Sequence, residues 1–292
     1  MTAAIVSSVA CTNRLKDYTQ VTMQASLFEQ TATVTPEILE TTKAIIETRL
    51  TGLGVEQAEI KIVEPDKIVV RLPEQVNARA AEAILTSTGK LYFRNQRPDT
   101  ADRLAENIAD LQRLLIEQNT LTQADRQATE PTEDQADKQV EAEALQQAID
   151  EKRGAIAALF KPTELTGELL YDAEIQPTDT GSDIWDVQIQ FDAQGADLFA
   201  AQTKAMAGTG RSIGLFLDNV LLSTPQVSAD YTKTGITVGS AVISGNFTKA
   251  AAKDLQVQLQ SGPLPVILET VELCRYQSGE GACWRSIEAA GL

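Results

Sequence analysis

Two cysteines near the C-terminus are the residues whose type and spacing point most directly to chemistry. Cys274 and Cys283 are separated by eight residues, in a stretch rich in glycine and polar side chains. In an oxidising compartment, a disulfide between them would close a small loop and contribute about 2 to 3 kcal/mol to stability. In a reducing compartment, they would be unremarkable free thiols. The residues alone leave both alternatives open.

Cys11 offers a different chemistry, the attachment of a lipid. It follows Ser8-Val9-Ala10 at the end of a short apolar stretch. This pattern fits either a degenerate lipoprotein signal, with Cys11 as the acylated residue, or a disordered tail over residues 1–18. The tail is favoured, because the stretch lacks a positively charged start and has Ser8 where such signals usually carry leucine.

Catalytic chemistry finds little support in the residue types. The sequence contains no histidine, which excludes Ser-His-Asp and Cys-His catalysis and most zinc sites. Three carboxylates, Asp183, Asp186 and Asp192, flank a predicted strand, but no pairing between them is visible, so we expect them to be solvated. We therefore predict no catalytic, cofactor-binding or metal-binding residues, and a protein that is not an enzyme.

The charge balance limits the partners of this protein. The formal net charge is −16, from 25 basic and 41 acidic residues. Such an excess of negative charge opposes binding to nucleic acid or to anionic lipid. The sequence has no run of 18 apolar residues, so we expect no membrane-spanning segment. Its 292 residues are enough for about two domains.

The two ends of the chain predict one α+β subdomain. An alternating strand begins at Gln20, a helix begins at Thr35-Pro36, and a hairpin, a second helix and a strand at 91–93 follow. A further strand is expected at 264–272. This order is typical of a ferredoxin-like fold, with the base formed by residues 19–98 and 263–273 and followed by a tail at 274–292.

Residues 99–161 predict an acidic helical insert. Residues 99–153 hold 14 acidic and 6 basic side chains, half of the net charge of the chain. Two apolar stripes at helical spacing indicate a helical hairpin with a polar linker at 120–135; they comprise Leu104, Ile108, Leu111 and Leu115, then Leu145, Ile149 and Ile156. The stripes either cover each other or form a docking arm for a partner helix.

Residues 162–262 predict a second α+β subdomain, the head. Strands are expected at 169–175, 185–191 and 241–243, helices at 193–207 and 248–261, and a hairpin at 213–222. The crossings between base and head, at 161–167 and 261–265, carry residues that either form a hinge or only end their elements. These residues are Pro162, Gly167, Gly262, Pro263 and Pro265.

Several segments resemble the large extracytoplasmic domain of SecD, a subunit of the protein-export translocase. The resemblance covers most of residues 19–272, in the order of the family, but without the transmembrane helices of that family. Its motifs are Arg49-Leu50-Thr51-Gly52-Leu53-Gly54-Val55, Leu165-Thr166-Gly167, Arg211-Ser212-Ile213-Gly214-Leu215-Phe216-Leu217-Asp218-Asn219, Gly245-Asn246-Phe247-Thr248 and the run from Leu259 to Glu272. The acidic insert is similar to that of the cyanobacterial and plastid branch.

The resemblance implies a role in protein export outside the cytosol, in a periplasm or thylakoid lumen. The domain would bind emerging unfolded polypeptide and move its head relative to its base, with SecF-like and SecY-channel components as partners. Because the family works outside the cytosol, we expect Cys274 and Cys283 to be bonded. The alternative is a stand-alone polypeptide-binding module, lipid-anchored through Cys11, that no longer belongs to a translocase.

Overall fold

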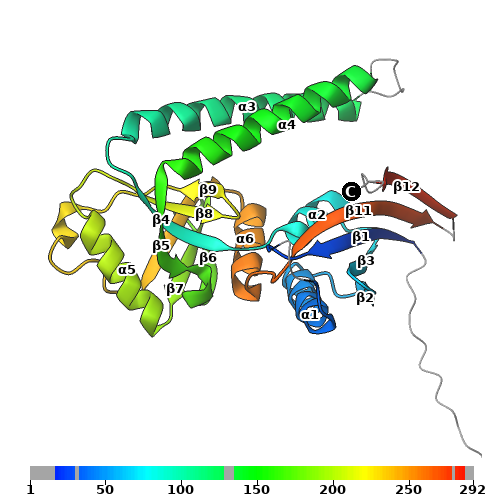
Figure 1. Cartoon of the computed structure of the whole chain (residues 1–292), viewed down its shortest axis with the longest axis horizontal. Helices are drawn as coiled ribbons and strands as arrows, with labels where there is room; N and C mark the ends of the chain where they lie inside the picture. Colours follow the sequence, from blue (N-terminus) through cyan, green and yellow to red (C-terminus); the bar gives the residue numbers. More distant parts are fainter. Residues whose placement is uncertain (1–16, 30–32, 128–134, 278–279, 287–292) are drawn as a thin grey trace, which may run out of the picture. The chain divides into compact units, whose positions relative to one another are not determined.

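The protein divides into two units. The structure, a computed structural model, describes residues 17–29, 33–127, 135–277 and 280–286. We call the unit formed by the chain up to residue 88 and from residue 264 onward the base, and the unit formed by residues 89–263 the head (Figure 1). Each unit has a hydrophobic core of its own.

The base is an antiparallel sheet covered by two helices. The strand order is β12-β11-β1-β3-β2, and every pair of neighbours is antiparallel. In chain order, the elements are β1 (Tyr18–Ser26), α1 (Pro36–Gly52), β2 (Glu59–Val63), β3 (Lys67–Pro73), α2 (Ala78–Thr86), β11 (Ile267–Gln277) and β12 (Glu280–Ser286).

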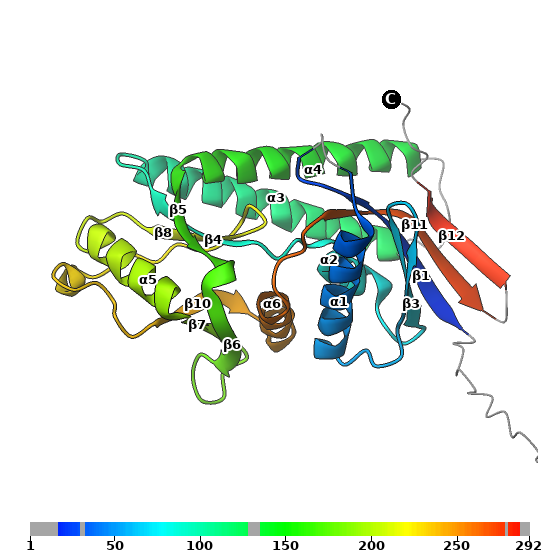
Figure 2. The same cartoon turned by 60° about the horizontal axis from the view of Figure 1, so that its bottom comes forward.

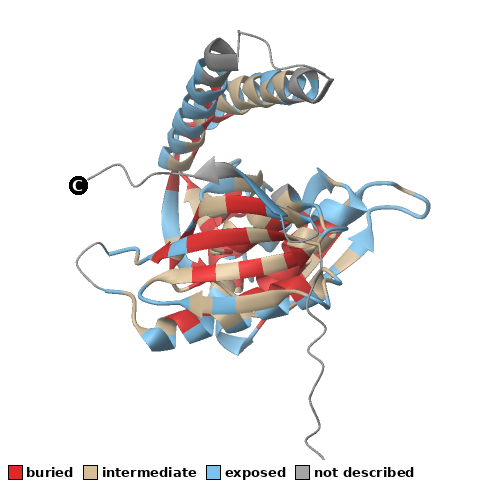
Figure 3. Ribbon diagram, turned by 90° about the vertical axis from the view of Figure 1, so that its right-hand side faces the viewer, coloured by how far each residue is buried: buried red, intermediate tan, exposed pale blue. Residues whose placement is uncertain are grey.

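One face of the base sheet is apolar because its strands alternate in side-chain direction. Val21, Met23 and Val70 are fully buried there, against Leu39 and Ile46 of α1. Figure 3 looks onto this unit and shows buried residues along the middle of its strands. The helix α1 begins as the sequence predicts, because the Thr35 hydroxyl accepts a hydrogen bond from the Ile38 amide.

A buried arginine joins the two helices of the base. Arg49, on α1, is fully buried. Its Nη1 donates hydrogen bonds to the carbonyl oxygens of Ile84 and Ser87, at 2.8 and 2.5 Å, and its Nη2 donates to that of Thr88 at 3.4 Å. These are the open carbonyls at the C-terminal end of α2, so the guanidinium caps that helix and offsets its negative end.

The head contains two antiparallel sheets, with strand orders β5-β4-β8-β9 and β10-β7-β6, and a helical hairpin (Figure 2). Phe93 of the first sheet packs edge-on against Phe191 of the second, with ring centroids 5.5 Å apart. The strands are β4 (Leu91–Gln96), β5 (Phe160–Thr166), β6 (Leu170–Pro177), β7 (Trp185–Phe191), β8 (Ile213–Leu217), β9 (Val220–Ser223) and β10 (Ser240–Phe247). The helices are α3 (Ala101–Gln127), α4 (Gln135–Ala158), α5 (Ala193–Met206) and α6 (Lys249–Ser261), with 3₁₀ turns at Gly167–Leu169 and Ala229–Tyr231.

The acidic insert forms the helical hairpin that the sequence predicts, and its root is part of the head. Leu104 and Ile156 pack with Phe160 and Phe216 of the head sheet. Farther out, Lys152 Nζ of α4 donates to Asp110 Oδ2 of α3 at 2.7 Å. The two stripes thus cover each other near the root. The linker predicted at 120–135 was too long, since α3 continues through Gln127 and α4 begins at Gln135; residues 128–134 lie outside the described residues.

Three expected boundaries were wrong. We expected the strand after α2 to belong to the base, whereas β4 pairs with β5 and β8 in the head, so the first part of the base ends at residue 88 instead of 98. The insert therefore lies within the head rather than between subdomains. The segment from 274, expected to be a tail, continues β11 and forms β12 of the base sheet.

Replacing Arg49 with methionine tests the helix-capping role of this side chain. R49M removes the guanidinium donor from the carbonyls of Ile84, Ser87 and Thr88, so we expect a loss of about 3 kcal/mol in the free energy of unfolding, measured with urea. The control is K43M, which removes an exposed pair with Glu47 on the same helix and should cost less than about 0.5 kcal/mol. Equal stability of the two variants would contradict the capping role.

The ion pair between the hairpin helices predicts a pH dependence. The hydrogen bond from Lys152 lowers the pKa of Asp110 below its ordinary 3.8. A carboxyl with a lowered pKa in the folded state stabilises the fold above its ordinary pKa, and this contribution is lost as the pH falls through the lowered pKa. D110N should therefore lower Tm at about pH 7, and at an acidic pH below the lowered pKa the Tm values of the variant and the natural protein should converge.

The matched control is D150N, since Asp150 pairs with Arg153 of its own helix and does not bridge the hairpin. Its Tm should follow that of the natural protein at both pH values. A Tm difference between D110N and the natural protein that persists unchanged in acid would show that the ion pair is not its cause.

Candidate functional site

The head contains an apolar groove that sequence reasoning missed. It encloses about 500 Å³ and is lined by residues of β4, β8, β10, α5 and the loop between β9 and β10. Its floor includes the buried side chains of Phe93, Phe199 and Leu215. At its rim, Val238 is 75% exposed and Tyr231 is 40% exposed. A concave surface with an apolar floor and exposed apolar rim can bind apolar side chains.

The loop that forms the outer wall of the groove is fixed to α5. The Thr203 hydroxyl accepts a hydrogen bond from the Ile236 amide at 2.8 Å and donates to the Phe199 carbonyl at 2.7 Å. Next to it, Gly235 has a φ of +72°, and a Cβ there would lie 1.9 Å from the Ala200 carbonyl oxygen. Only glycine allows this close approach. The wall is therefore held in place by the helix behind it.

One side of the groove is an open strand edge. β10 is the last strand of its sheet, and its residues 240–242 line the groove. Phe191 of β7 donates its amide hydrogen to the Gly239 carbonyl at 2.9 Å. Because hydrogen bonding alternates along antiparallel strands, Ala241 also directs its amide and carbonyl toward β7. The main-chain groups of Ser240 and Val242 consequently point away from β7, toward the free edge.

The predicted hinge residues are only partly at the crossings. The chain passes between base and head at residues 88–89 and 263–264. Gly262, which ends α6 with a φ of +76°, Pro263 and Pro265 flank the second crossing. The sequence analysis did not predict the first crossing. Gly89, with a φ of +71°, lies just after α2, and glycine in this conformation commonly ends a helix.

Pro162 and Gly167 lie within the head, so their proposed place at a crossing was wrong. Pro162 is in β5, opposite Arg94 of β4. Gly167 packs against Leu91, since a Cβ at this position would lie 2.8 Å from Leu91 Cβ. Gly167 does line a small hollow of about 70 Å³ in the head, together with Gly89 and Pro263. It therefore lies near the crossings without connecting the units.

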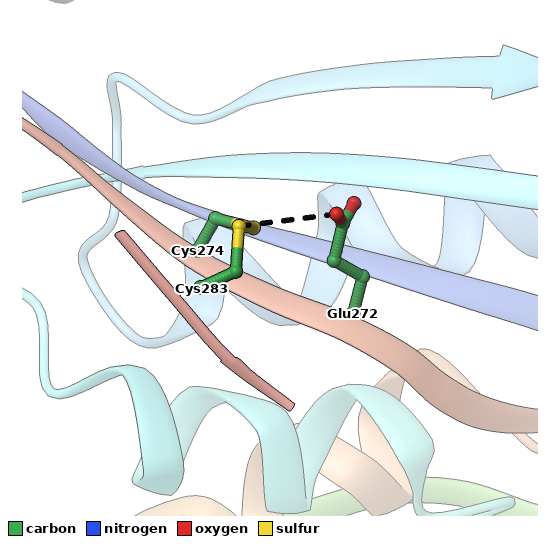
Figure 4. A group of neighbouring side chains, drawn as sticks. All are labelled: Glu272, Cys274 and Cys283. Carbon is green, nitrogen blue, oxygen red and sulfur yellow. Dashed lines mark hydrogen bonds between the residues drawn. A yellow bond between two sulfur atoms is a disulfide. The ribbon is translucent and has the colours of Figure 1, made fainter. Parts of the chain in front are cut away.

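Cys274 and Cys283 face each other across β11 and β12 and are bonded in the structure. Cys274 is fully buried, whereas Cys283 is exposed. Glu272 lies on the same side of the strand (Figure 4), and its Oε2 accepts a hydrogen bond from the Thr22 hydroxyl at 3.3 Å. The bond between the cysteines in the native protein stays a prediction. Cys11 lies outside the described residues.

The three carboxylates singled out in the sequence do not form a site together. Asp192 Oδ1 accepts the Gly195 amide at 2.7 Å and caps α5. Asp186 is buried, with 8% exposure, so the expectation that it is solvated was wrong, while Asp183 is exposed.

Among the described residues, none of the helices combines the length and the apolar character that a membrane-spanning segment requires.

Two protein-family models match this chain. The model of the SecDF P1 head subdomain matches residues 142–266. The model of the N-terminal part of the P1 domain of the protein translocase subunit SecDF matches residues 39–98. Together they cover most of the head and the first part of the base.

Curated relatives and solved structures agree with these matches. The chain is 38% identical to protein translocase subunit SecD of Synechocystis sp. over 88% of its own length and 53% of that protein, and 27% identical to SecD of Prochlorococcus marinus over 89% and 56%. The chain thus spans about half the length of these relatives. A structure described as that of a membrane component SecDF that enhances protein export has the same fold, with a TM-score of 0.58, 23% identity, and coverage of 87% of this chain and 98% of that one. From the identity to the Synechocystis protein and the two family models, the chain belongs to the SecD family of protein translocase subunits.

Proposed function

We propose that this chain is the extracytoplasmic domain of a SecD-type subunit, and that its head groove binds extended segments of polypeptides during export. The observation that carries this proposal is an apolar groove of about 500 Å³ whose wall is a strand edge with outward-pointing main-chain groups. Apolar rim residues and outward-pointing amides together suit one ligand above others, a polypeptide in an extended conformation.

The mode of binding that we propose is strand addition to β10. An incoming segment would exchange hydrogen bonds with the main chain of Ser240 and Val242 and place alternate side chains over the floor of the groove. Main-chain hydrogen bonds do not depend on the sequence of the ligand, and an apolar floor accepts many side chains. This combination fits a domain that must handle many different exported proteins.

We further propose that the head moves relative to the base about the two crossings. Leu264 donates its amide hydrogen to the Thr88 carbonyl at 2.7 Å, so the base ends of both connections lie side by side. Two adjacent connections form a narrow joint, and each carries a glycine or proline next to it. A segment bound to the head would then be carried by this motion.

The remaining expectations complete the proposal. The order β-α-β-β-α-β and the strand order β11-β1-β3-β2 support a ferredoxin-like base. The relatives are protein translocase subunits, which supports SecF-like and SecY-channel components as partners. The chain spans about half of their length, and we place the energy-transducing step outside this domain. We place the domain on the extracytoplasmic side, in a periplasm or thylakoid lumen.

A proline at position 242 tests strand addition. V242P removes an amide that points to the free edge, where proline is tolerated because no ladder hydrogen bond of the sheet is lost. We expect about 10-fold weaker binding of a reduced, carboxymethylated protein that stays unfolded, measured by fluorescence anisotropy, because at least one intermolecular hydrogen bond disappears. The Tm of the variant should change little.

The matched control is V242T, which keeps the amide and the β-branched shape. Its affinity for the unfolded protein should stay within about 3-fold of the natural chain. Equal affinities of V242P and V242T would rule out strand addition. If Y231A, at the rim of the groove, also left binding unchanged, the groove itself would not be the site.

Spin labels on both units test the movement of the head. One label replaces Glu47 of the base, whose side chain is 55% exposed, and the other replaces the exposed Lys204 of the head, in a C11S background with the native cysteine pair oxidised. We expect a broad or bimodal distribution of distances between the two labels, and we expect it to change when the carboxymethylated unfolded ligand is added.

A control pair within the head, K204C with E164C, should give one narrow distance under both conditions. A head–base distribution as narrow as this control, and unaffected by the unfolded protein, would contradict the hinge.

A further inference from the structure

The cysteine pair of the base lies beside a carboxylate in an arrangement that the export function does not use. One oxygen of Glu272 and the Sγ atoms of Cys274 and Cys283 all lie within 4.8 Å of one another. Glu272 Oε1 is 3.9 Å from Cys283 Sγ (Figure 4). Two sulfurs and one carboxylate oxygen are ligand atoms that a borderline-soft divalent cation accepts.

The base sheet holds these three side chains in place before any ligand arrives. Cys274 and Cys283 are register partners on β11 and β12. Glu272 lies two residues before Cys274 on the same strand, and alternation places both on one face of the sheet. The Thr22 hydroxyl on β1 donates to Glu272 Oε2, which leaves Oε1 toward the sulfurs. A hydrogen bond that orients a carboxylate ligand in this way is a common feature of metal sites.

The oxidation state of the two cysteine sulfurs decides whether these groups can bind a cation. In the disulfide, neither sulfur can supply a thiolate. After reduction, two thiols stand next to one carboxylate. A divalent cation bound to all three replaces the thiol protons. The geometry therefore favours metal binding in the reduced state only.

We propose that the reduced base binds one Zn²⁺ through Cys274, Cys283 and Glu272, and that disulfide formation abolishes the site. Reduction proceeds by thiol–disulfide exchange: an external dithiol transfers two electrons and two protons to the cysteine sulfurs and becomes a disulfide itself. Zn²⁺ then displaces the two thiol protons, which go to solvent. Zn²⁺ prefers four ligands in a tetrahedron, and because Cys283 is exposed, water reaches the fourth position.

The test uses the full chain with the substitution C11S, so that only the paired cysteines can supply thiols. One sample is reduced on an immobilised phosphine and handled without oxygen; the other is kept oxidised. We expect one equivalent of Zn²⁺ per reduced chain in competition with a chromophoric chelator, and none per oxidised chain. Co²⁺ in place of Zn²⁺ should give thiolate-to-metal charge-transfer absorption in the reduced sample alone.

Variants identify the ligands. In the reduced state, E272Q should weaken Zn²⁺ binding about 10- to 100-fold, and T22V, which removes the orienting hydrogen bond, about 10-fold. The matched control is E269Q, an exposed carboxylate on the same strand, which should leave the affinity unchanged. Both carboxylate variants keep the cysteines, so the oxidised form of each reports whether the base still folds.

Two results would overturn the proposal. One is a reduced chain that binds no more Zn²⁺ than its oxidised form. The other is an E272Q variant that binds Zn²⁺ as tightly as E269Q, which would remove the carboxylate from the site.

Discussion

The base depends on a guanidinium group that has no access to water. Burying the charge of Arg49 would be costly, but the carbonyl groups that close α2 surround it and satisfy it. The same contact extends to Thr88, the last residue of the base before the head, whose carbonyl also accepts the amide of Leu264 as the chain returns. One side chain on α1 thus fixes the end of a helix and, through Thr88, the place where both connections leave the base.

The buried arginine and the proposed polypeptide-binding groove lie in different units. The fixed point lies in the base, whereas the groove lies in the head, between β10 and a loop that Thr203 and Gly235 attach to α5. The groove is thus built from firm parts with one open strand edge. A binding surface of this kind needs little rearrangement to accept a ligand, which reduces the ordering cost of binding.

Short sequence patterns predicted most helices and strands of this fold. The pairing of strands far apart in the sequence could not be predicted from such patterns. Thr35, Asp192 and Thr248 cap helices as expected, because the signal for an N-cap lies within four residues. The strand β4 was predicted at 91–93 but assigned to the wrong unit, since its partners β5 and β8 lie about 70 and 120 residues away and no local pattern identifies them.

The functional residues show the same limit. The spacing of Cys274 and Cys283 is enough to predict that they lie opposite each other. The position of Glu272 next to them depends on the register of β11, and the outward direction of the Val242 amide depends on the register of β10, neither of which the sequence predicts. The loop before β10 carries Val227, Ile236 and Val238 among polar residues. Apolar residues in such a loop could have indicated the groove, but the sequence analysis did not use this signal.

The helical hairpin of α3 and α4 affects how the sequence of this domain can evolve. The helices α3 and α4 replace what would otherwise be a tight turn between β4 and β5, which are neighbours in one sheet. The entropic cost of closing a loop rises only slowly with its length, and residues inserted between paired neighbours do not alter the register of either strand. Beyond the root, where Leu104 and Ile156 pack with Phe160 and Phe216, the connection between Gln96 and Phe160 is therefore a place where evolution can lengthen or shorten the helices without changing the pairing of β4 with β5.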